Sequence, residues 1–257
     1  MKITILGSGS AYGVPMMFNT WGNADSLNPK NNRTRASILI EAEGKSVLVD
    51  CGPDFREQIN KNNVKNIDAV LMTHGHYDHI AGIPELPRAT KLLGHGIDVY
   101  AAIGTMAELK NSFGYLFKDK AEAEPDSKSI NWKLLPDFGD FSISGLNLIT
   151  CQLPHHSMMS SAFRYQNFAY VTDWQEMPAN VMAKLQDLDL LILECNNGTE
   201  PADNGHSDLF KVKEVLAKIN PKKTILTHLS VRVDHETFLA SLPKNCLLAY
   251  DGMEIEI

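Results

Sequence analysis

Five short apolar runs of this sequence end at a residue that can bind a metal ion or take part in proton transfer. The runs are rich in β-branched and aliphatic side chains, as strands buried on both faces of a sheet are. Their final residues are Asp50, His74, Asp173, Glu194 and His228. Side chains at strand ends stand on a rigid frame, which a site of fixed geometry requires. The pattern predicts a functional site where these strands end.

The segments between these runs are plausible helices. We expect helices at about Pro53 to Asn62, over residues 86–94, and beginning near Ile103, Pro178, His206 and His235. The stretch from Phe141 to Arg164 is typical of consecutive strands, and residues 122–129 of an exposed loop and not a domain linker. Strands that alternate with helices, with a run of strands in the middle, predict a layered α/β sandwich. We assign residues 1–257 to one domain.

The most concentrated chemistry lies in the sequence THGHYDH, at the end of the second run. Three of the nine histidines of the chain fall within six positions there, beside an aspartate. Neutral imidazole is the commonest metal ligand, and histidines beside a carboxylate are costly to bury unless something pairs them. The spacing of His74, His76, Asp78 and His79 does not fit one helix face, but it suits a loop that enters a helix. We interpret the segment as a metal cradle.

Four residues beyond the cradle are candidates to complete the site. Asp173 and His228 stand at strand ends, and His156 lies in LPHHSMMS, where His155 is an equally good local candidate. His206 lies in DNGHSDLF, a turn that runs into a helix whose first amides favour an anion. The residues alone leave the choice between His155 and His156 open.

Other polar residues receive more modest interpretations. Asp50 is expected to orient the histidine loop by hydrogen bonding and not to bind metal itself. Glu194 either does similar work or caps its strand in solvent, and both readings stay open. His95 and His235 are expected to be ordinary surface histidines.

The cradle and the residues after it resemble the metallo-β-lactamase superfamily. THGHYDH has the form of that superfamily's HxHxDH motif, and His156, Asp173 and His228 follow in the order that completes two metal sites. The resemblance implies an αβ/βα sandwich with metals at one edge, which agrees with the strand-end pattern. It leaves the reaction open, because the same cradle serves lactamases, thioesterases, nucleases, diesterases and oxidoreductases.

Further segments resemble a narrower family, the phosphoribosyl cyclic phosphate phosphodiesterases of the carbon–phosphorus lyase pathway. These segments are GSGSAYGVP, CNNGTEPADNGHSDL, and ILTHLSVRVD through DGMEI. The resemblance implies that Asp173 bridges two metals and that His206 is a non-ligand histidine near the substrate phosphate. The first metal would be bound by His74, His76, His156 and Asp173, and the second by Asp78, His79, Asp173 and His228.

One departure from this family concerns an additional structural zinc. The family holds it with a cysteine cluster after GVP and a histidine after the THxS motif. Here Asn19, Trp21 and Ala24 stand at the cysteine positions and Val231 at the histidine position. We therefore expect the third zinc site to be missing, with Phe18 and Trp21 packing the loop down in its place.

The predicted function is a hydrolase with two divalent transition-metal ions, manganese or zinc, acting on a small cyclic phosphodiester. Two such ions lower the pKa of a bridging water, and the resulting hydroxide would attack phosphorus. His206 and Asp78 would be the catalytic residues. Alternatives are a nuclease of the same fold, a thioesterase or a lactonase. An alternative of another class is a non-hydrolytic metal-binding accessory protein of cofactor biosynthesis.

Charge and composition bear on partners and location. The net charge of −7 argues against nucleic acid and anionic membrane as partners. No apolar stretch approaches the roughly 20 residues of a membrane span. The first residues, MKITILGSGS, do not form a secretory signal, and the four cysteines include no CxxC pair. We expect a cytoplasmic protein that acts on a small molecule, and a homodimer is compatible with the sequence.

Overall fold

The computed structural model describes residues 1–117, 130–202 and 205–257, so the predicted loop at 122–129 lies outside the described residues. The strands of the first sheet are β1 (Lys2–Gly7), β2 (Ser37–Ala42), β3 (Lys45–Val49), β4 (Ala69–Leu71), β5 (Ile97–Ala101), β6 (Ile130–Leu134) and β14 (Glu254–Glu256). Those of the second are β7 (Phe138–Ile143), β8 (Leu146–His155), β9 (Met158–Tyr165), β10 (Phe168–Val171), β11 (Leu190–Glu194), β12 (Lys223–Thr227) and β13 (Cys246–Leu248). The α-helices are α1 (Phe55–Lys61), α2 (Tyr77–Ile80), α3 (Leu86–Leu93), α4 (Ile103–Phe113), α5 (Ala179–Lys184), α6 (Leu209–Ile219) and α7 (His235–Leu239).

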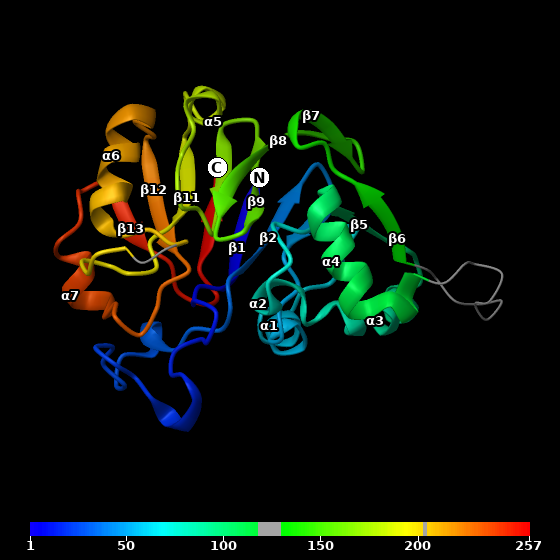
Figure 1. The fold of residues 1–257 in the computed structure, drawn as a ribbon. Helices are drawn as coiled ribbons and strands as arrows, with labels where there is room; N and C mark the ends of the chain where they lie inside the picture. The colour runs from blue at the N-terminus through cyan, green and yellow to red at the C-terminus, as the bar shows by residue number, and fades with distance from the viewer. Residues whose placement is uncertain (118–129, 203–204) are drawn as a thin grey trace.

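The two sheets are neighbours in the middle of the molecule, and the helices lie outside them (Figure 1). Their strand orders are β14-β1-β2-β3-β4-β5-β6 and β13-β12-β11-β10-β9-β8-β7. This is the αβ/βα sandwich expected for the superfamily that the sequence resembles. The five predicted strands and the predicted helices form, and the helix expected near His206 begins at Leu209.

Alternation along the strands builds three apolar layers. In β11, Leu190 and Ile192 face the core between the sheets, whereas Leu191 and Leu193 face the helices behind the second sheet. The first sheet has the same arrangement, with its own apolar layer beneath α1 to α4. Fully burying a side chain of this size stabilises the fold by roughly 1.5–3 kcal/mol. Continuous apolar runs in the central strands follow from this burial on both faces.

A long excursion between β1 and β2 extends beyond the strand ends (dark blue, bottom of Figure 1). Its anchor is Arg33, whose guanidinium is buried and donates to the carbonyl of Val233 at 2.8 Å and to Oδ1 of Asn31 at 2.7 Å. Asn31 in turn donates to Asp234 at 2.7 Å. These contacts join the excursion to the segment just before α7.

One expectation for this excursion is wrong. Phe18 does not pack the loop down, because its side chain is 98% exposed at the tip of the excursion. The base of the excursion contacts the segment around Val231 through backbone atoms instead. The amide of Asn23 donates to the carbonyl of Val231 at 2.8 Å, and a side chain on Gly22 would meet that same carbonyl.

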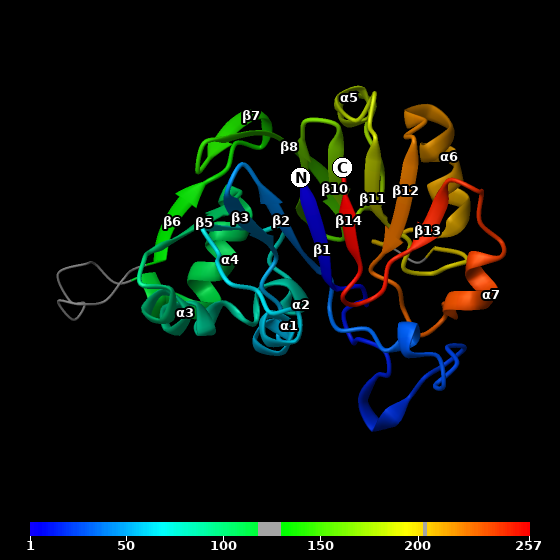
Figure 2. The same ribbon diagram turned by 180° about the vertical axis from the view of Figure 1, so that it is seen from behind.

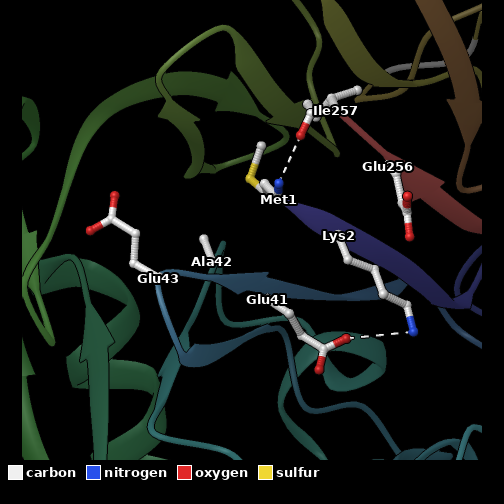
Figure 3. A pocket seen from close by; sticks show the side chains of 7 residues that line it. All are labelled: Met1, Lys2, Glu41, Ala42, Glu43, Glu256 and Ile257. Atoms are coloured by element: carbon white, nitrogen blue, oxygen red, sulfur yellow. Dashed lines mark hydrogen bonds and ion pairs between the residues drawn. The ribbon is translucent and has the colours of Figure 1, made fainter.

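The chain ends meet at the far end of β1, away from the strand ends that carry the predicted site. The amino group of Met1 donates to the carbonyl of Ile257 at 2.7 Å. A pocket beside this contact is lined by charged side chains, including Lys2 and Glu41, which form an ion pair (Figure 3). The reverse view shows β14 beside β1 (Figure 2). Among the described residues, no helix has the length and apolar character needed to cross a membrane.

Candidate metal centre

The cradle leaves β4 as a loop and continues into the short helix α2. Asp50, at the end of the neighbouring strand β3, holds this loop: it accepts hydrogen bonds from the amide and the hydroxyl of Thr73, both at 2.8 Å. Its Oδ2 also lies 2.7 Å from Nδ1 of His79, which donates to it. This contact leaves Nε2 of His79 facing the other ligand-type side chains. Asp50 thus has the orienting position that the sequence predicts.

Three ring nitrogens converge at the first group of side chains. Nδ1 of His76 lies 2.9 Å from Nε2 of His74 and 3.2 Å from Nε2 of His155. A ring nitrogen carries either one lone pair or one hydrogen in its plane, so it cannot make good hydrogen bonds to both neighbours. A cation shared by three lone pairs accounts for this convergence. The group His74, His76 and His155 therefore suits a metal ion.

The structure brings His155 to this group, and not its neighbour His156. His155 is the last residue of β8, and its side chain is fully buried. His156 follows with a positive φ of 47° and is exposed. Its ring packs against Gly205, where a Cβ atom would come within 2.2 Å of the imidazole. His156 thus lies on the rim of the site, with its ring centroid 5.5 Å from that of His206.

A second group contains Asp78, His79 and His228. Oδ2 of Asp78 lies 3.0 Å from Nε2 of His79 and 3.5 Å from Nε2 of His228. Nε2 of His79 is buried and has no hydrogen-bond partner among the described residues, which is costly for a polar atom. A metal ion bound here would satisfy that nitrogen.

Asp173 lies between the two groups. Its Oδ1 is 3.4 Å from Nε2 of His228 and 3.6 Å from Nε2 of His155, and its Oδ2 is 3.2 Å from Nε2 of His79. Burial alone would raise the pKa of this carboxyl, but His228 and His79 hold it well below its usual value. An ionised, buried carboxylate between two sets of nitrogens suits a bridge between two cations. We call Asp173 and the six residues of the two groups the ligand cluster.

Three residues at strand ends share an unusual backbone. Asp50, Asp173 and His228 have φ values of 63°, 52° and 56°, in the left-handed region. This conformation is uncommon for residues other than glycine and concentrates at functional sites. It turns the chain abruptly after each strand, so the side chain projects at the sheet edge.

Contacts behind the ligand cluster fix its imidazoles. Nδ1 of His155 donates to the carbonyl of Gly205 at 2.6 Å, which directs Nε2 toward Asp173. Nδ1 of His228 lies 3.1 Å from the side-chain amide of Asn196. Burial lowers the pKa of His155 to about 4 and that of His74 well below its usual value. These rings are therefore neutral near pH 7, the form that binds metal.

His206 stands beside the ligand cluster and is held by Glu194. Nδ1 of His206 lies 2.9 Å from Oε1 of Glu194 and 3.7 Å from Oδ1 of Asp173. Glu194 is fully buried and also accepts from the amides of Trp174 and Ser207. This burial excludes a strand cap in solvent, one of the two readings of Glu194. The orienting reading remains.

The ligand cluster opens into a cleft of about 820 Å³. Its lining includes three histidines and one aspartate of the candidate site, namely His76, His156, His206 and Asp78. Its lining also includes Ala11, Tyr12, Met16, Met17, Phe18, Arg35 and Tyr77. Sequence reasoning did not find this second set, because a loop without periodic patterning gives no sign of what it faces.

Comparison with known proteins establishes the family. A model of the β-lactamase superfamily domain matches residues 45–229, which include the cradle, His155, Asp173 and His228. The chain belongs to the β-lactamase superfamily. A crystal structure of a diphosphatase of the PhnP family superposes with a TM-score of 0.88, at 30% identity, covering 100% of this chain and 97% of that one. This likeness is consistent with the narrower resemblance found in the sequence.

Two other similar proteins carry different names, so similarity to one relative does not by itself identify the reaction. Zinc-bound PqqB from Methylobacterium extorquens has the same fold, with a TM-score of 0.80, 18% identity and full coverage of both chains. An octanoyltransferase of Porphyromonas gingivalis is 29% identical over 99% of this chain but only 51% of its own length. The chain thus spans about half of that relative. The superfamily match, the likeness to the diphosphatase and the donor set together support a metal-dependent hydrolase.

Proposed function

We propose that the protein is a dinuclear metal-dependent phosphodiesterase that acts on small organic phosphodiesters. The observation that carries the proposal is the position of Asp173 between two groups of ligand atoms, each able to hold one cation. His74, His76 and His155 would hold the first cation, and Asp78, His79 and His228 the second. In this proposal His155 replaces His156, because only His155 points its nitrogen into the first group.

Two bound cations would supply a nucleophile from water near neutral pH and offset the negative charge of the phosphate. The residues of the chain would hold the cations and orient the ligands. Asp50 and the carbonyl of Gly205 fix ring orientation, so that little reorganisation is needed during the reaction. Asp173 is the carboxylate between the two halves of the cluster, and Asp78 belongs to the second half.

His206 would contact the phosphate or pass a proton to the departing oxygen. Nδ1 faces Glu194, and this contact fixes the ring beside Asp173 in the lining of the cleft. His206 lines the large cleft and also a neighbouring cavity of about 290 Å³ that contains Ser10, Asn196 and Ser230. A reacting group placed beside His206 would therefore have space for an organic substituent on both sides, as a diester requires and a monoester does not.

Other observations favour a small diester over the alternatives. A cleft of this size is typical of small-molecule sites, and the net charge of −7 opposes binding to a nucleic acid. The protein with which the chain superposes over its whole length is a diphosphatase. A diphosphate that carries organic groups is accordingly within the proposed substrate range.

The test combines metal content with hydrolysis on the same preparations. Protein purified without chelator should contain about two equivalents of transition metal and hydrolyse bis(p-nitrophenyl) phosphate. His206→Ala should keep the metal and lower kcat by about 10²-fold. His95→Gln is the matched control, because His95 precedes β5 and contacts Asn66, outside the cleft. Metal content near zero would overturn the dinuclear site, and hydrolysis of p-nitrophenyl acetate or a thioester but not of the diester would overturn the substrate class.

A further inference from the structure

The cleft beside the ligand cluster has several exposed aromatic and apolar side chains in its lining. Tyr12 is 70% exposed, Tyr77 67% and Phe18 98%, and Met17 beside them is 76% exposed. All four line the same cleft as His76 and His206. A contiguous exposed apolar surface of this kind marks a binding site more often than a neutral surface. We call Tyr12, Phe18 and Tyr77 the aromatic rim.

Phe18 is held in its exposed position by a strained backbone. Its φ of 60° lies in the left-handed region, and Asn19 follows with a φ of 57°. For a bulky residue this conformation is an outlier that persists only where the surroundings impose it. The left-handed backbone of Phe18 and the exposure of its apolar ring both cost free energy. Because Phe18 also lines the cleft, we interpret it as a residue that contacts a ligand.

The loop that carries Phe18 is closed by its own backbone. The amides and carbonyls of Met16 and Thr20 pair at 2.9 and 3.2 Å, and the Thr20 hydroxyl donates to the carbonyl of Met17 at 3.0 Å. The base of the loop is joined to Val231 by the Asn23 contact described above. Phe18 is thus presented by a braced turn.

Arg35 supplies a positive charge in the same cleft. Its Nη1 is held by Asp54, at 3.3 Å from Oδ1 and 3.2 Å from Oδ2. Its Nε is buried and has no hydrogen-bond partner among the described residues. A guanidinium that is held by Asp54 and lines the cleft suits a phosphate because its planar fork matches two oxygens.

We propose that the aromatic rim binds the planar base of a nucleotide-type substrate and that Arg35 binds a second phosphate. The substrate would be a nucleoside diphosphate ester, with one phosphate at the ligand cluster. This proposal rests on the proposed function, because it places the reacting phosphate at that cluster. Rigid rings favour a planar partner, since each ring can stack on it at a small cost in conformational freedom. An alkyl substituent would gain no stacking.

Equilibrium binding to the metal-loaded protein tests the proposal without requiring turnover. Calorimetry should give an affinity for AMP about ten-fold higher than for ribose 5-phosphate, because only AMP has a base to stack. Tyr12→Ala and Tyr77→Ala should each remove most of this preference while leaving the affinity for ribose 5-phosphate within about two-fold. Tyr77→Ala could disturb the adjacent ligands His76 and Asp78 indirectly. Tyr12 is distant from the cluster residues in the sequence, so the same result in Tyr12→Ala would show that the effect comes from the lost ring.

Two controls make the test specific. Tyr115→Ala removes a ring that is 59% exposed but lies outside the cleft, so it should change neither affinity. Arg35→Gln should lower the affinity for ADP about ten-fold and that for AMP much less, since only ADP carries the second phosphate. Equal wild-type affinities for AMP and ribose 5-phosphate, or equal losses of both in the tyrosine variants, would overturn the aromatic rim.

The outcomes also separate this proposal from the proposed function. If the protein prefers AMP but hydrolyses no diester, the function fails and the ring-binding site stands. If it hydrolyses bis(p-nitrophenyl) phosphate with no preference for AMP, the function stands and the aromatic rim is refuted.

Discussion

The ligand cluster and the aromatic rim line one cleft but are built in different ways. Members of the ligand cluster lie at the ends of strands from both sheets, are largely buried, and are fixed by partners such as Asp50. Two members of the aromatic rim lie in one loop excursion and are exposed. The rigid side has the geometry that metal binding demands, whereas the loop side can differ between relatives without disturbing that geometry. In our proposals, the ligand cluster therefore determines the type of reaction, and the aromatic rim determines which substrate is bound.

The largest expected effect comes from removing the bridge between the two halves of the cluster. Asp173→Asn should lose most of both metals and reduce diester hydrolysis to the background rate, because each group then lacks its shared carboxylate. Asparagine tolerates the left-handed φ of 52°, so backbone strain is not the cause. Metal analysis and kinetics would check this. Asp187→Asn, at a similar φ of 57° but exposed in a turn, is the control and should change neither.

The next effect distinguishes two adjacent histidines. His155→Ala should lower the metal content from about two equivalents to about one, since the first group would keep only two imidazoles. His156→Ala should retain both metals, because its ring lies on the rim of the site. Elemental analysis of the paired variants decides the matter. Loss of metal in His156→Ala with retention in His155→Ala would reverse the assignment.

A smaller effect is expected behind the cluster. Glu194→Gln should keep the metals and lower kcat by about 10- to 100-fold, because His206 would lose the carboxylate that orients its ring. Steady-state kinetics measures this, with the exposed Glu176→Gln as a control for the loss of one negative charge. A change in metal content with unchanged kcat per bound metal would instead assign Glu194 to metal retention.

The smallest effect concerns the anchor of the loop excursion. Burial, with the nearby charges of Lys30 and Arg33, lowers the pKa of His235 to about 4, against 6.5 for the unperturbed group. Between these values the unfolded chain binds a proton that the folded protein excludes, so His235 should cost stability as pH falls from 6.5 toward 4. The loss relative to pH 7 is on the order of 2 kcal/mol at pH 5.

Denaturant unfolding at pH 7 and pH 5 would test the last expectation. The variant His235→Gln should lose less stability between the two pH values than the natural chain. An equal loss in both proteins would show that His235 does not titrate as its burial implies. His235 is 2% exposed, so the expectation that it is a surface residue is wrong.

The strands and the cradle could be predicted because their signals are local. An apolar run that ends in His or Asp reports both a buried strand and the edge at which it stops, as β4 with His74 and β12 with His228 illustrate. The choice between His155 and His156 depended on strand register, which moves every side chain to the other face with a shift of one residue. Counting by twos from the buried Cys151 and Leu153 reaches His155, a signal that was present in the sequence.

Other features required the tertiary structure. Glu194 ends a run in which every residue is buried, and only the fold shows that His206, Ser207 and Trp174 converge on its carboxylate. The position of Phe18 could not be inferred either, since apolar composition predicts burial and this side chain is exposed. Sequence patterning reports what a residue prefers on average, and a binding surface is where that preference is overridden.

One half-buried carboxylate sets the order in which two segments of this molecule can be joined during synthesis. Asp251 accepts four hydrogen bonds, from the amide and hydroxyl of Ser8 and of Thr34, at 2.7 to 2.9 Å. These bonds join residues separated by 243 and 217 positions. Translation proceeds at roughly 5–20 residues per second, so a nascent chain has already made the cradle many seconds before Asp251 exists. The loop excursion, whose Thr34 is made 217 residues before Asp251, must therefore wait for that carboxylate before it is fixed beside the ligand cluster.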